Sequence, residues 1–215
     1  MIPGLGQATL LALFGGALHG GDATERMSAF EIQQFAPIHA DRQIELTNAS
    51  WFFAEQHHFG GRLTLKLGAS ASRARGGIEQ LTGSFEDGTL RTQVLDSPAW
   101  GVGATVSAGL RLGQAGRATW ALESSGSLML YDRGFPNGGT RVNGMLQAGP
   151  SVAWDLGRGR SVTLGARWTH ISNGQGLGPH NPSYEGGGLH VRYQRPLRGK
   201  GSAAAAPAAR NASTS

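Results

Sequence analysis

Strict alternation of apolar and polar residues along several long segments is the feature of this sequence that most constrains its fold. The clearest run places an apolar side chain at every second position from Trp100 to Leu112, with glycine, threonine, serine and arginine between them. The same period recurs within 62–69, 119–130, 142–155, 161–168 and 189–194. Because successive side chains of a strand point to opposite faces, this period predicts β-strands with one apolar and one polar face.

Three further features favour strands that cross a membrane. The alternating segments run for about ten residues or more, the length that a tilted strand needs to span a bilayer. Their polar face consists mainly of glycine, serine and threonine with single charged residues between them, which is typical of a narrow barrel interior. The tryptophans lie near the ends of these segments, where an aromatic belt would form: Trp51, Trp100, Trp120, Trp154 and Trp168. A soluble β-sandwich and a lipocalin-like barrel are the alternatives.

The strand count follows from the turns. Glycine-bearing connections at 113–116 and 156–159 join long strands directly. An even number of strands closed into a barrel leaves no unpaired edge in the lipid. The predicted fold class is therefore all-β, an eight-stranded antiparallel up-and-down transmembrane β-barrel. Its expected strands cover 42–53, 62–72, 88–96, 100–112, 118–131, 141–155, 160–171 and 187–196.

Composition excludes several other classes of protein. Only 15% of the 215 residues are charged, whereas soluble domains average about a quarter. The chain has no cysteine, which excludes disulfides, thiolate zinc sites and cysteine nucleophiles. The net charge is +5, but the arginines are scattered singly and form no basic run, so we do not expect nucleic-acid binding. No apolar run of transmembrane-helix length follows the N-terminal segment.

Composition also divides the chain into three parts. Residues 1–23 contain an apolar run at 8–18 without a basic segment before it, and we expect a degraded or truncated signal peptide there. Residues 24–197 are expected to form the barrel domain. Residues 198–215 are rich in alanine, basic and without large apolar side chains, and we expect them to be disordered.

Reactive side chains are densest at 169–174 and 181–185, where one expected strand ends and the next begins. His170 and Ser172 are two residues apart, so in a strand they share one face with their Cα atoms about 7 Å apart. That face also carries Trp168 and is the lipid-facing one. Placing an imidazole and a hydroxyl against lipid is costly, which indicates that the two side chains serve a function.

A serine hydroxyl becomes a nucleophile only beside a base, and the base needs an acid to orient it. Glu185 begins the next strand and would reach His170 across an antiparallel hairpin. From the residues alone, a second interpretation is also open. A histidine and a serine two apart at a strand end are common as polar decoration of the membrane interface.

The residues His-Ile-Ser-Asn-Gly at 170–174, Asn-Pro at 181–182, Glu185 and a closing strand that ends Tyr-Gln-Arg-Pro-Leu at 193–197 resemble the PagL family of lipid A 3-O-deacylases. The resemblance is tightest over 141–197; the earlier strands match in pattern rather than in motif. It implies an eight-stranded outer-membrane barrel with a Ser-His-Glu triad on its outer, lipid-facing wall.

Residue by residue, the resemblance places the family's base on His170, its nucleophile on Ser172 and its acid on Glu185. The asparagine that follows the nucleophile falls on Asn173, and the asparagine of the loop falls on Asn181. The sequence departs from the family pattern in two respects. The loop before Glu185 is one residue longer, and the chain continues past the final strand.

The implied activity is that of an outer-membrane serine esterase in a Gram-negative bacterium. It would hydrolyse the 3-O-linked acyl chain of lipid A, as part of lipopolysaccharide in the outer leaflet, and release a 3-hydroxy fatty acid. Backbone N–H groups at Gly174, Gly176 and Asn181 would stabilise the oxyanion. This chemistry needs no metal and no other cofactor. The sequence is compatible with a monomer or an oligomer.

Two other functions compete with this hypothesis. One is a non-enzymatic small barrel of the structural or adhesion class, in which His170 and Ser172 are interfacial residues. The other is an esterase of the same architecture that acts on other lipid esters. Glu185 and Asn181 argue against the structural barrel, which does not require them at this spacing.

Overall fold

A computed structural model describes residues 25–84, 89–173 and 182–197. Within these ranges no helix is long and apolar enough to cross a membrane. The described residues form antiparallel strands instead: β1 (Glu25–Pro37), β2 (Arg42–His58), β3 (Leu63–Ser84), β4 (Thr89–Asp96), β5 (Ala99–Ala115), β6 (Ala118–Tyr131), β7 (Val142–Gly157), β8 (Arg160–Ser172) and β9 (Tyr184–Pro196).

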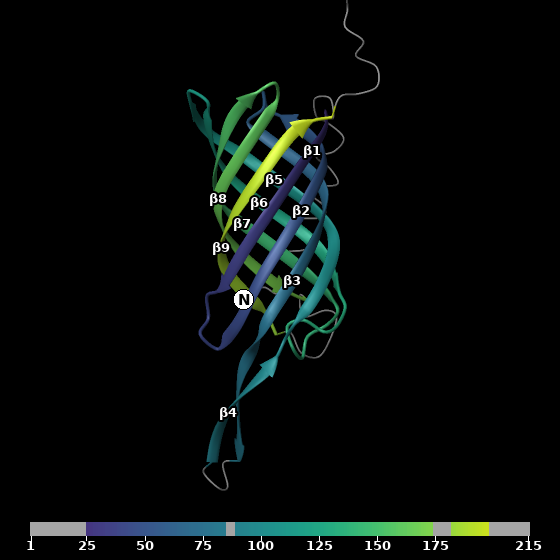
Figure 1. The fold of residues 1–215 in the computed structure, drawn as a ribbon, viewed down its shortest axis with the longest axis vertical. Coiled ribbons are helices and arrows are strands. Elements are labelled where there is room, and N and C mark those ends of the chain that lie inside the picture. Colours follow the sequence, from purple (N-terminus) through teal and green to yellow (C-terminus); the bar gives the residue numbers. More distant parts are fainter. Residues whose placement is uncertain (1–24, 85–88, 174–181, 198–215) are drawn as a thin grey trace, which may run out of the picture.

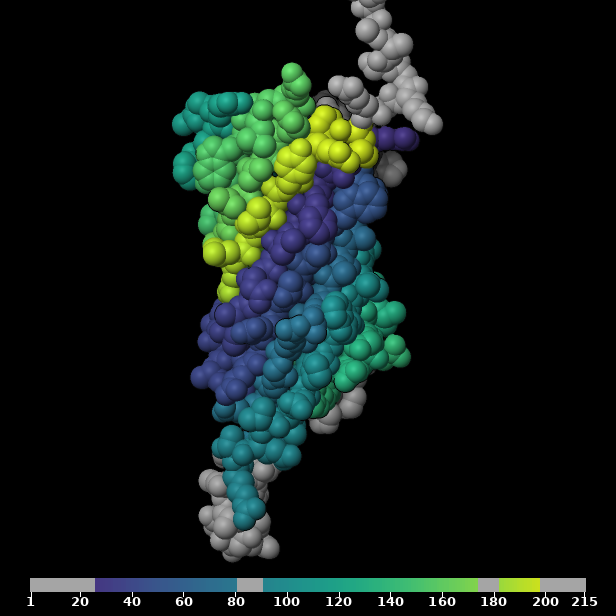
Figure 2. Space-filling view, viewed as in Figure 1, coloured from purple at the N-terminus to yellow at the C-terminus, as the bar shows by residue number. Residues whose placement is uncertain are grey.

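The strands close into a barrel (Figure 1). Their order is β2-β1-β9-β8-β7-β6-β5-β3, and pairing of β2 with β3 completes the ring. Figure 2 shows β9 and β1 packed side by side as adjacent diagonal bands, although they lie at opposite ends of the described chain. The predicted fold class, an eight-stranded antiparallel barrel, is confirmed.

One of the eight strands predicted to form the barrel lies outside it, and another strand takes its place. The segment predicted at 88–96 forms β4, but β4 pairs only with Gly77–Ser84 of β3. This hairpin projects beyond the barrel at the bottom of Figure 1. The missing wall strand is β1, which pairs with β2 and β9. Only Phe30 and Ile32 form its row of large exposed apolar side chains, so its alternation is too short to mark a membrane strand.

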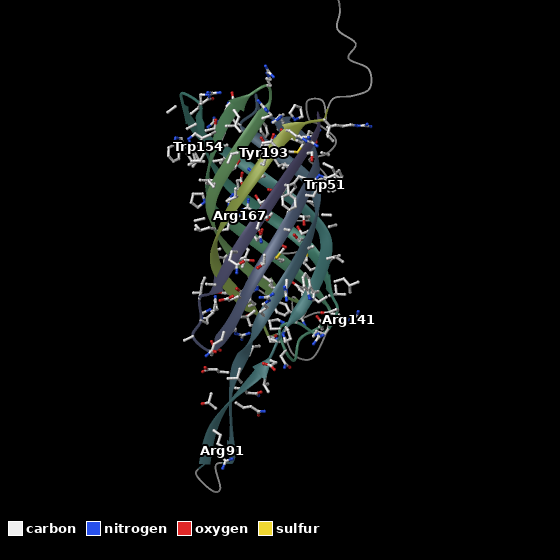
Figure 3. All side chains as sticks on the ribbon, in the orientation of Figure 1. Trp51, Arg91, Arg141, Trp154, Arg167 and Tyr193 are labelled. Carbon is white, nitrogen blue, oxygen red and sulfur yellow. The ribbon has the colours of Figure 1, made fainter. Side chains whose placement is uncertain are left out.

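Side chains alternate across the wall as the period predicts. The row from Trp100 to Leu112 on β5 faces outward, and Thr105 and Ser107 between its members are buried. All five tryptophans are at least 39% exposed on the outer surface. Figure 3 shows Trp51, Trp154 and Tyr193 near one rim. Trp100, at the start of β5, and Trp168, near the end of β8, lie toward the opposite rim. The outer wall is therefore apolar with aromatic residues toward both rims, as a membrane barrel requires.

Side chains fill the middle of the barrel and its end at Tyr131 and Tyr184, whereas a cavity of about 420 Å³ lined by Lys66, Glu123 and Arg192 opens toward the other end. Ser50, Ser70, Thr105 and Ser127 form a chain of hydroxyl hydrogen bonds across four strands, with oxygen–oxygen distances of 2.6–2.8 Å. Arg167 lies in the middle of the barrel in Figure 3. One end is closed by a buried apolar cluster: Phe35, Ile44, Leu46, Ala74, Ala99, Met129, Tyr131, Phe135, Met145, Ile171 and Tyr184.

The two rims of the barrel differ in their connections. At one rim β2, β5 and β7 join their successors through short turns at 59–62, 116–117 and 158–159. In the last of these, Arg158 and Gly159 have φ of 57° and 70°, a left-handed conformation that glycine adopts without strain. The opposite rim, here called the long-loop rim, carries the β3–β4 hairpin and the connections at 132–141 and 173–183. Outer-membrane barrels turn their longer loops outward from the cell.

Candidate active site on the outer wall

The β8–β9 hairpin brings His170 and Glu185 together at the long-loop rim. Their Cα atoms are direct cross-strand partners, and the imidazole Nδ1 lies 3.1 Å from Glu185 Oε1. Both side chains point outward and are partly exposed, 26% for His170 and 31% for Glu185. The longer loop before Glu185 therefore does not displace this carboxylate from the histidine. Antiparallel register places it there, although 14 residues separate the two along the chain.

The His170 ring is held on two sides. It stacks on the Trp168 ring with centroids 5.8 Å apart and an interplanar angle of 20°. Its Nδ1–H donates to Glu185, which leaves the Nε2 lone pair as the basic site of the neutral ring. This is the tautomer that a general base requires when a nucleophile approaches from the Nε2 side.

Ser172 ends β8 two residues beyond His170, on the same outward row. It is only 6% exposed, between buried Ile171 and Asn173. Its cross-strand neighbour on β7 is Gly144, which offers no side chain to cover it. Among residues 25–84, 89–173 and 182–197 the structure records no hydrogen bond from Ser172 to His170. In enzymes without bound substrate, such bonds are often long and tighten only in the substrate complex.

The remaining candidate residues divide into two groups. Asn173 is described and is 4% exposed. Gly174, Gly176 and Asn181, the candidates for the oxyanion site, lie outside the described residues. The structure therefore brings together the expected base and acid, and places the expected nucleophile next to them on the same face.

His39 is a neighbour of this site that the sequence did not reveal. It lies in the β1–β2 turn, and its Nε2 is 3.2 Å from the second carboxylate oxygen of Glu185. The same turn holds the start of β9, because the Ile38 N–H donates to the Glu185 carbonyl oxygen at 3.1 Å and Arg42 donates to the Ser183 carbonyl oxygen. This contact could be predicted only by recognising β1 as a strand, because the pairing of β1 with β9 places the β1–β2 turn beside the start of β9.

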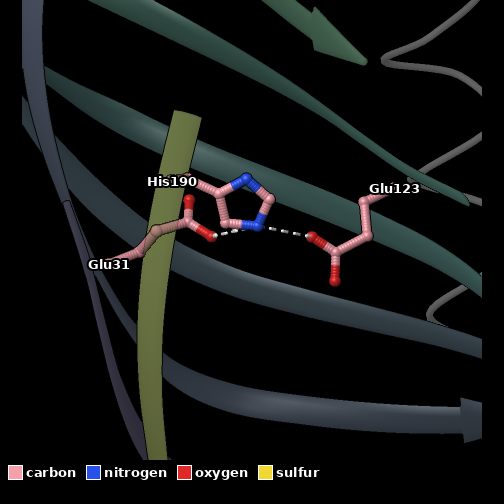
Figure 4. A group of neighbouring side chains, drawn as sticks. All are labelled: Glu31, Glu123 and His190. Atoms are coloured by element: carbon pink, nitrogen blue, oxygen red, sulfur yellow. Dashed lines mark ion pairs between the residues drawn. The ribbon is translucent and has the colours of Figure 1, made fainter. Parts of the chain in front are cut away.

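A second group of ionisable side chains lies inside the barrel (Figure 4). Glu31, Glu123 and His190 are buried and present ligand atoms within 4.8 Å of one another, a geometry that resembles a metal site. However, Arg167 and Arg192 each bind both carboxylates: Arg167 at 2.9 Å from Glu31 and 2.5 Å from Glu123, and Arg192 at 3.1 Å from Glu31. Two guanidinium charges thus balance two carboxylates, and a dication would add uncompensated charge in a buried interior.

This interior group is therefore interpreted as structural. His190 Nε2 lies 3.8 Å from Glu31 and 3.7 Å from Glu123, completing the cluster. Gly165 provides the space for the ring, because a Cβ there would lie 2.3 Å from His190 Cε1. We call Glu31, Glu123, Arg167, His190 and Arg192 the interior charge cluster.

The sequence and the fold are similar to those of known proteins. A sequence model of the family described as lipid A 3-O-deacylase (PagL) matches residues 44–194. Among solved structures, the barrel is similar to the outer membrane enzyme PagL, with 16% identity, a TM-score of 0.50, and coverage of 79% of this chain and 99% of that chain. It is also similar to Neisserial surface protein A, with 11% identity, a TM-score of 0.50, and coverage of 83% and 100%. No curated protein sequence matches significantly. At these identities the structural likeness shows the fold alone.

Proposed function

The chain belongs to the PagL family of lipid A 3-O-deacylases, and from that premise we propose that it is an outer-membrane serine esterase that removes the 3-O-linked acyl chain of lipid A. One observation carries the proposal. A histidine–carboxylate pair stands on the outward wall at the long-loop rim, with a serine two residues away on the same row. A base and its orienting acid beside a hydroxyl are the parts that acyl transfer needs.

The mechanism assigns one role to each residue. Ser172 Oγ attacks the ester carbonyl carbon while His170 Nε2 takes the hydroxyl proton. Glu185 accepts the Nδ1–H bond, keeps the ring in the required tautomer and stabilises the imidazolium. When the tetrahedral intermediate collapses, the bond to the sugar 3-oxygen breaks and His170 returns the proton to that oxygen. Water, activated by His170, then releases the 3-hydroxy fatty acid from Ser172.

The oxyanion of the intermediate needs donors close to Ser172. Asn173 follows the nucleophile directly and is the described candidate. We assign the same role to backbone N–H groups at Gly174, Gly176 and Asn181, on the basis of the family resemblance. Preorganised donors of this kind typically contribute a factor of about 10²–10³ in rate for each donor.

The outward position of the site suits a substrate that lies in the membrane. Lipid A in the outer leaflet presents its ester at the level of the sugar headgroup, and the long-loop rim is the end that faces outward from the cell. Leu164 and Trp168 extend the row from His170 toward the membrane interior, and both are exposed. They provide an apolar surface along which an acyl chain can lie.

Mass spectrometry of lipid A is the direct test of this function. We expect cells that express the protein to yield lipid A lighter by one 3-hydroxyacyl group, that is, by the mass of the 3-hydroxy fatty acid minus that of the water added in hydrolysis. Cells that express the Ser172→Ala variant at the same level are the control, and their lipid A should be unchanged. Unchanged lipid A with the wild-type chain would favour the structural barrel. Loss of acyl chains from phospholipids alone would favour the esterase of other lipids.

The roles of His170 and Glu185 predict unequal losses. Without its acid, a histidine still samples the correct tautomer, so Glu185→Ala should retain about a hundredfold more activity than His170→Ala. The measurement is the initial rate of fatty-acid release from lipid A in detergent. His39→Ala should reduce the rate less than Glu185→Ala does, because it leaves the Glu185 bond to His170 in place.

Matched variants separate orientation from charge in this experiment. His39→Gln keeps a hydrogen-bond donor toward Glu185 and should behave like the wild type. His57→Ala, at the opposite rim, removes a histidine that contacts Glu55 at 3.0 Å and should leave the rate unchanged. Equal rates for Glu185→Ala and wild type would show that another group orients His170.

A further inference from the structure

The outer wall carries a second polar region at the long-loop rim. A recess of about 480 Å³ opens on the surface of β1, β2, β3 and β5. Its lining includes Gln34, Glu45, Thr47, Arg73, Arg75 and Trp100. We call this surface the arginine recess. In the ring of strands β3 is the fourth from β8 in either direction, so the recess lies on the opposite side of the barrel from His170.

The depth of the recess in the membrane follows from β5. Trp100 is the first of the outward apolar residues that continue to Leu112. Twelve residue steps at about 3.4 Å span about 40 Å of strand, and a tilt of about 40° reduces this to a rise of about 30 Å. That rise equals the thickness of the hydrocarbon core of a bilayer. Trp100 therefore marks the outer hydrocarbon boundary, and the neighbouring arginines lie at the level of the headgroups.

The first arginine is held in place by this tryptophan. The guanidinium carbon of Arg73 lies 4.7 Å from the centre of the Trp100 ring. Such cation–π contacts stabilise the charge over the ring and leave the N–H groups at the edge of the guanidinium able to donate to a ligand. Arg73 is thus positioned in the boundary layer.

The other polar side chains of the recess supply mainly hydrogen-bond donors for a ligand. Arg75 stands opposite Glu45 in the β2–β3 register. The Thr47 hydroxyl donates to the Gln34 side-chain oxygen at 2.6 Å, so the remaining polar group of that amide is its NH₂ donor. Within the recess, two guanidinium groups accompany one carboxylate, which leaves a net positive charge there.

We propose that the arginine recess binds the phosphate of an outer-leaflet lipid, namely the phosphorylated sugar headgroup of lipopolysaccharide. Guanidinium groups bind phosphate oxygens through paired, charge-assisted hydrogen bonds, and the recess presents two of them at the depth where lipid phosphates lie. Because the recess is on the opposite wall from His170, the bound lipid is not the molecule that is hydrolysed. The site goes beyond the proposed function and would fix the barrel to its surrounding leaflet.

Binding of bisphosphorylated lipid A to detergent-solubilised protein, measured by native mass spectrometry, tests the proposal. All proteins carry Ser172→Ala so that the lipid is not consumed. Arg73→Gln with Arg75→Gln should weaken binding of one lipid molecule at least tenfold. The control is Arg26→Gln with Arg195→Gln, which removes the same charge from exposed side chains at the opposite rim and should bind as the parent does. Equal affinity of the parent and the Arg73/Arg75 variant would overturn the proposal.

Further measurements identify the source of the phosphate and test whether the substitutions disturb folding. Dephosphorylated lipid A should bind equally to the parent and the double variant, and a tenfold loss there too would contradict a phosphate contact. Millimolar inorganic phosphate should not displace the lipid; displacement would mean that the recess takes free phosphate. Arg73→Lys with Arg75→Lys keeps the charge and the fold, and should bind more weakly than the parent but more tightly than the glutamine variant. Equal affinities of the lysine variant and the parent for lipid A would exclude paired guanidinium contacts.

The outcome does not depend on catalysis. The binding measurements use protein without the Ser172 hydroxyl, so a protein that hydrolyses no lipid A would still show the difference between Arg73/Arg75 and control variants. Conversely, loss of that difference in an active enzyme would leave the esterase proposal intact.

Discussion

Ser172→Ala is expected to abolish fatty-acid release from lipid A while the barrel still assembles. The substitution removes the only atom assigned to carry the acyl group, and deletion of a nucleophile in a comparable triad lowers kcat by about 10⁶-fold. The hydroxyl is small and lies at the end of β8, so the free energy of unfolding should change by no more than about 1 kcal/mol. Initial rates in detergent, beside heat-modifiable migration of the folded barrel, measure both quantities.

Ser183→Ala is the matched control for this experiment. Ser183 lies just before β9 and has no histidine two residues away, and its contact with Arg42 uses the backbone carbonyl, which the substitution preserves. It should remain active. A folded and fully active Ser172→Ala variant would eliminate the serine-esterase mechanism and leave the structural barrel in its place.

Glu123→Gln is expected to produce the largest loss of stability. Glu123 is buried in the interior charge cluster and accepts hydrogen bonds from both Arg167 and Arg192. Neutralising it leaves two buried guanidinium groups with the single carboxylate of Glu31. Removing one partner of a buried ion pair typically costs about 3–5 kcal/mol. The urea midpoint for unfolding of the barrel in detergent measures the change.

A double-mutant cycle provides the control for this prediction. Glu123→Gln combined with Arg192→Gln restores the balance of charge and should be less destabilised than the sum of the single variants. Glu45→Gln removes an exposed carboxylate and should change stability by less than about 0.5 kcal/mol. An unchanged urea midpoint for Glu123→Gln would contradict this prediction. It would mean that the attraction between Glu123 and the two arginines only offsets the free-energy cost of burying the Glu123 carboxylate.

The sequence was sufficient to predict which face of each long strand meets lipid, because the alternation of side chains is a local property. Thr105 and Ser107 are buried and Trp100 and Leu112 are exposed, as the period of two requires. It was not sufficient to assign the strands to the ring. Gln34 interrupts the apolar row of β1 after two residues, and β4 is a strand that pairs outside the barrel.

The candidate site shows the same division. His170 and Ser172 share a face by local geometry, so the sequence predicted that relation correctly. The approach of Glu185 depends on the register of a hairpin whose loop length is not encoded by any periodicity. An antiparallel hairpin made the contact with His170 possible, and the family resemblance assigned Glu185 as the acid. The contact of His39 with Glu185 depends on closure between the first and last strands, which no local pattern reveals.

The apolar closure of the lumen at the long-loop rim has a consequence for the cell envelope. At the long-loop rim the Phe135 ring lies between two tyrosines, with its centroid 4.8 Å from that of Tyr131 and 6.4 Å from that of Tyr184, and all three side chains are fully buried. Beneath them the hydroxyl chain and the interior charge cluster occupy the lumen. We expect a barrel whose lumen is closed at this end to leave the permeability barrier of the membrane intact. Increased expression of the protein should therefore not admit the antibiotics and detergents that the outer leaflet excludes.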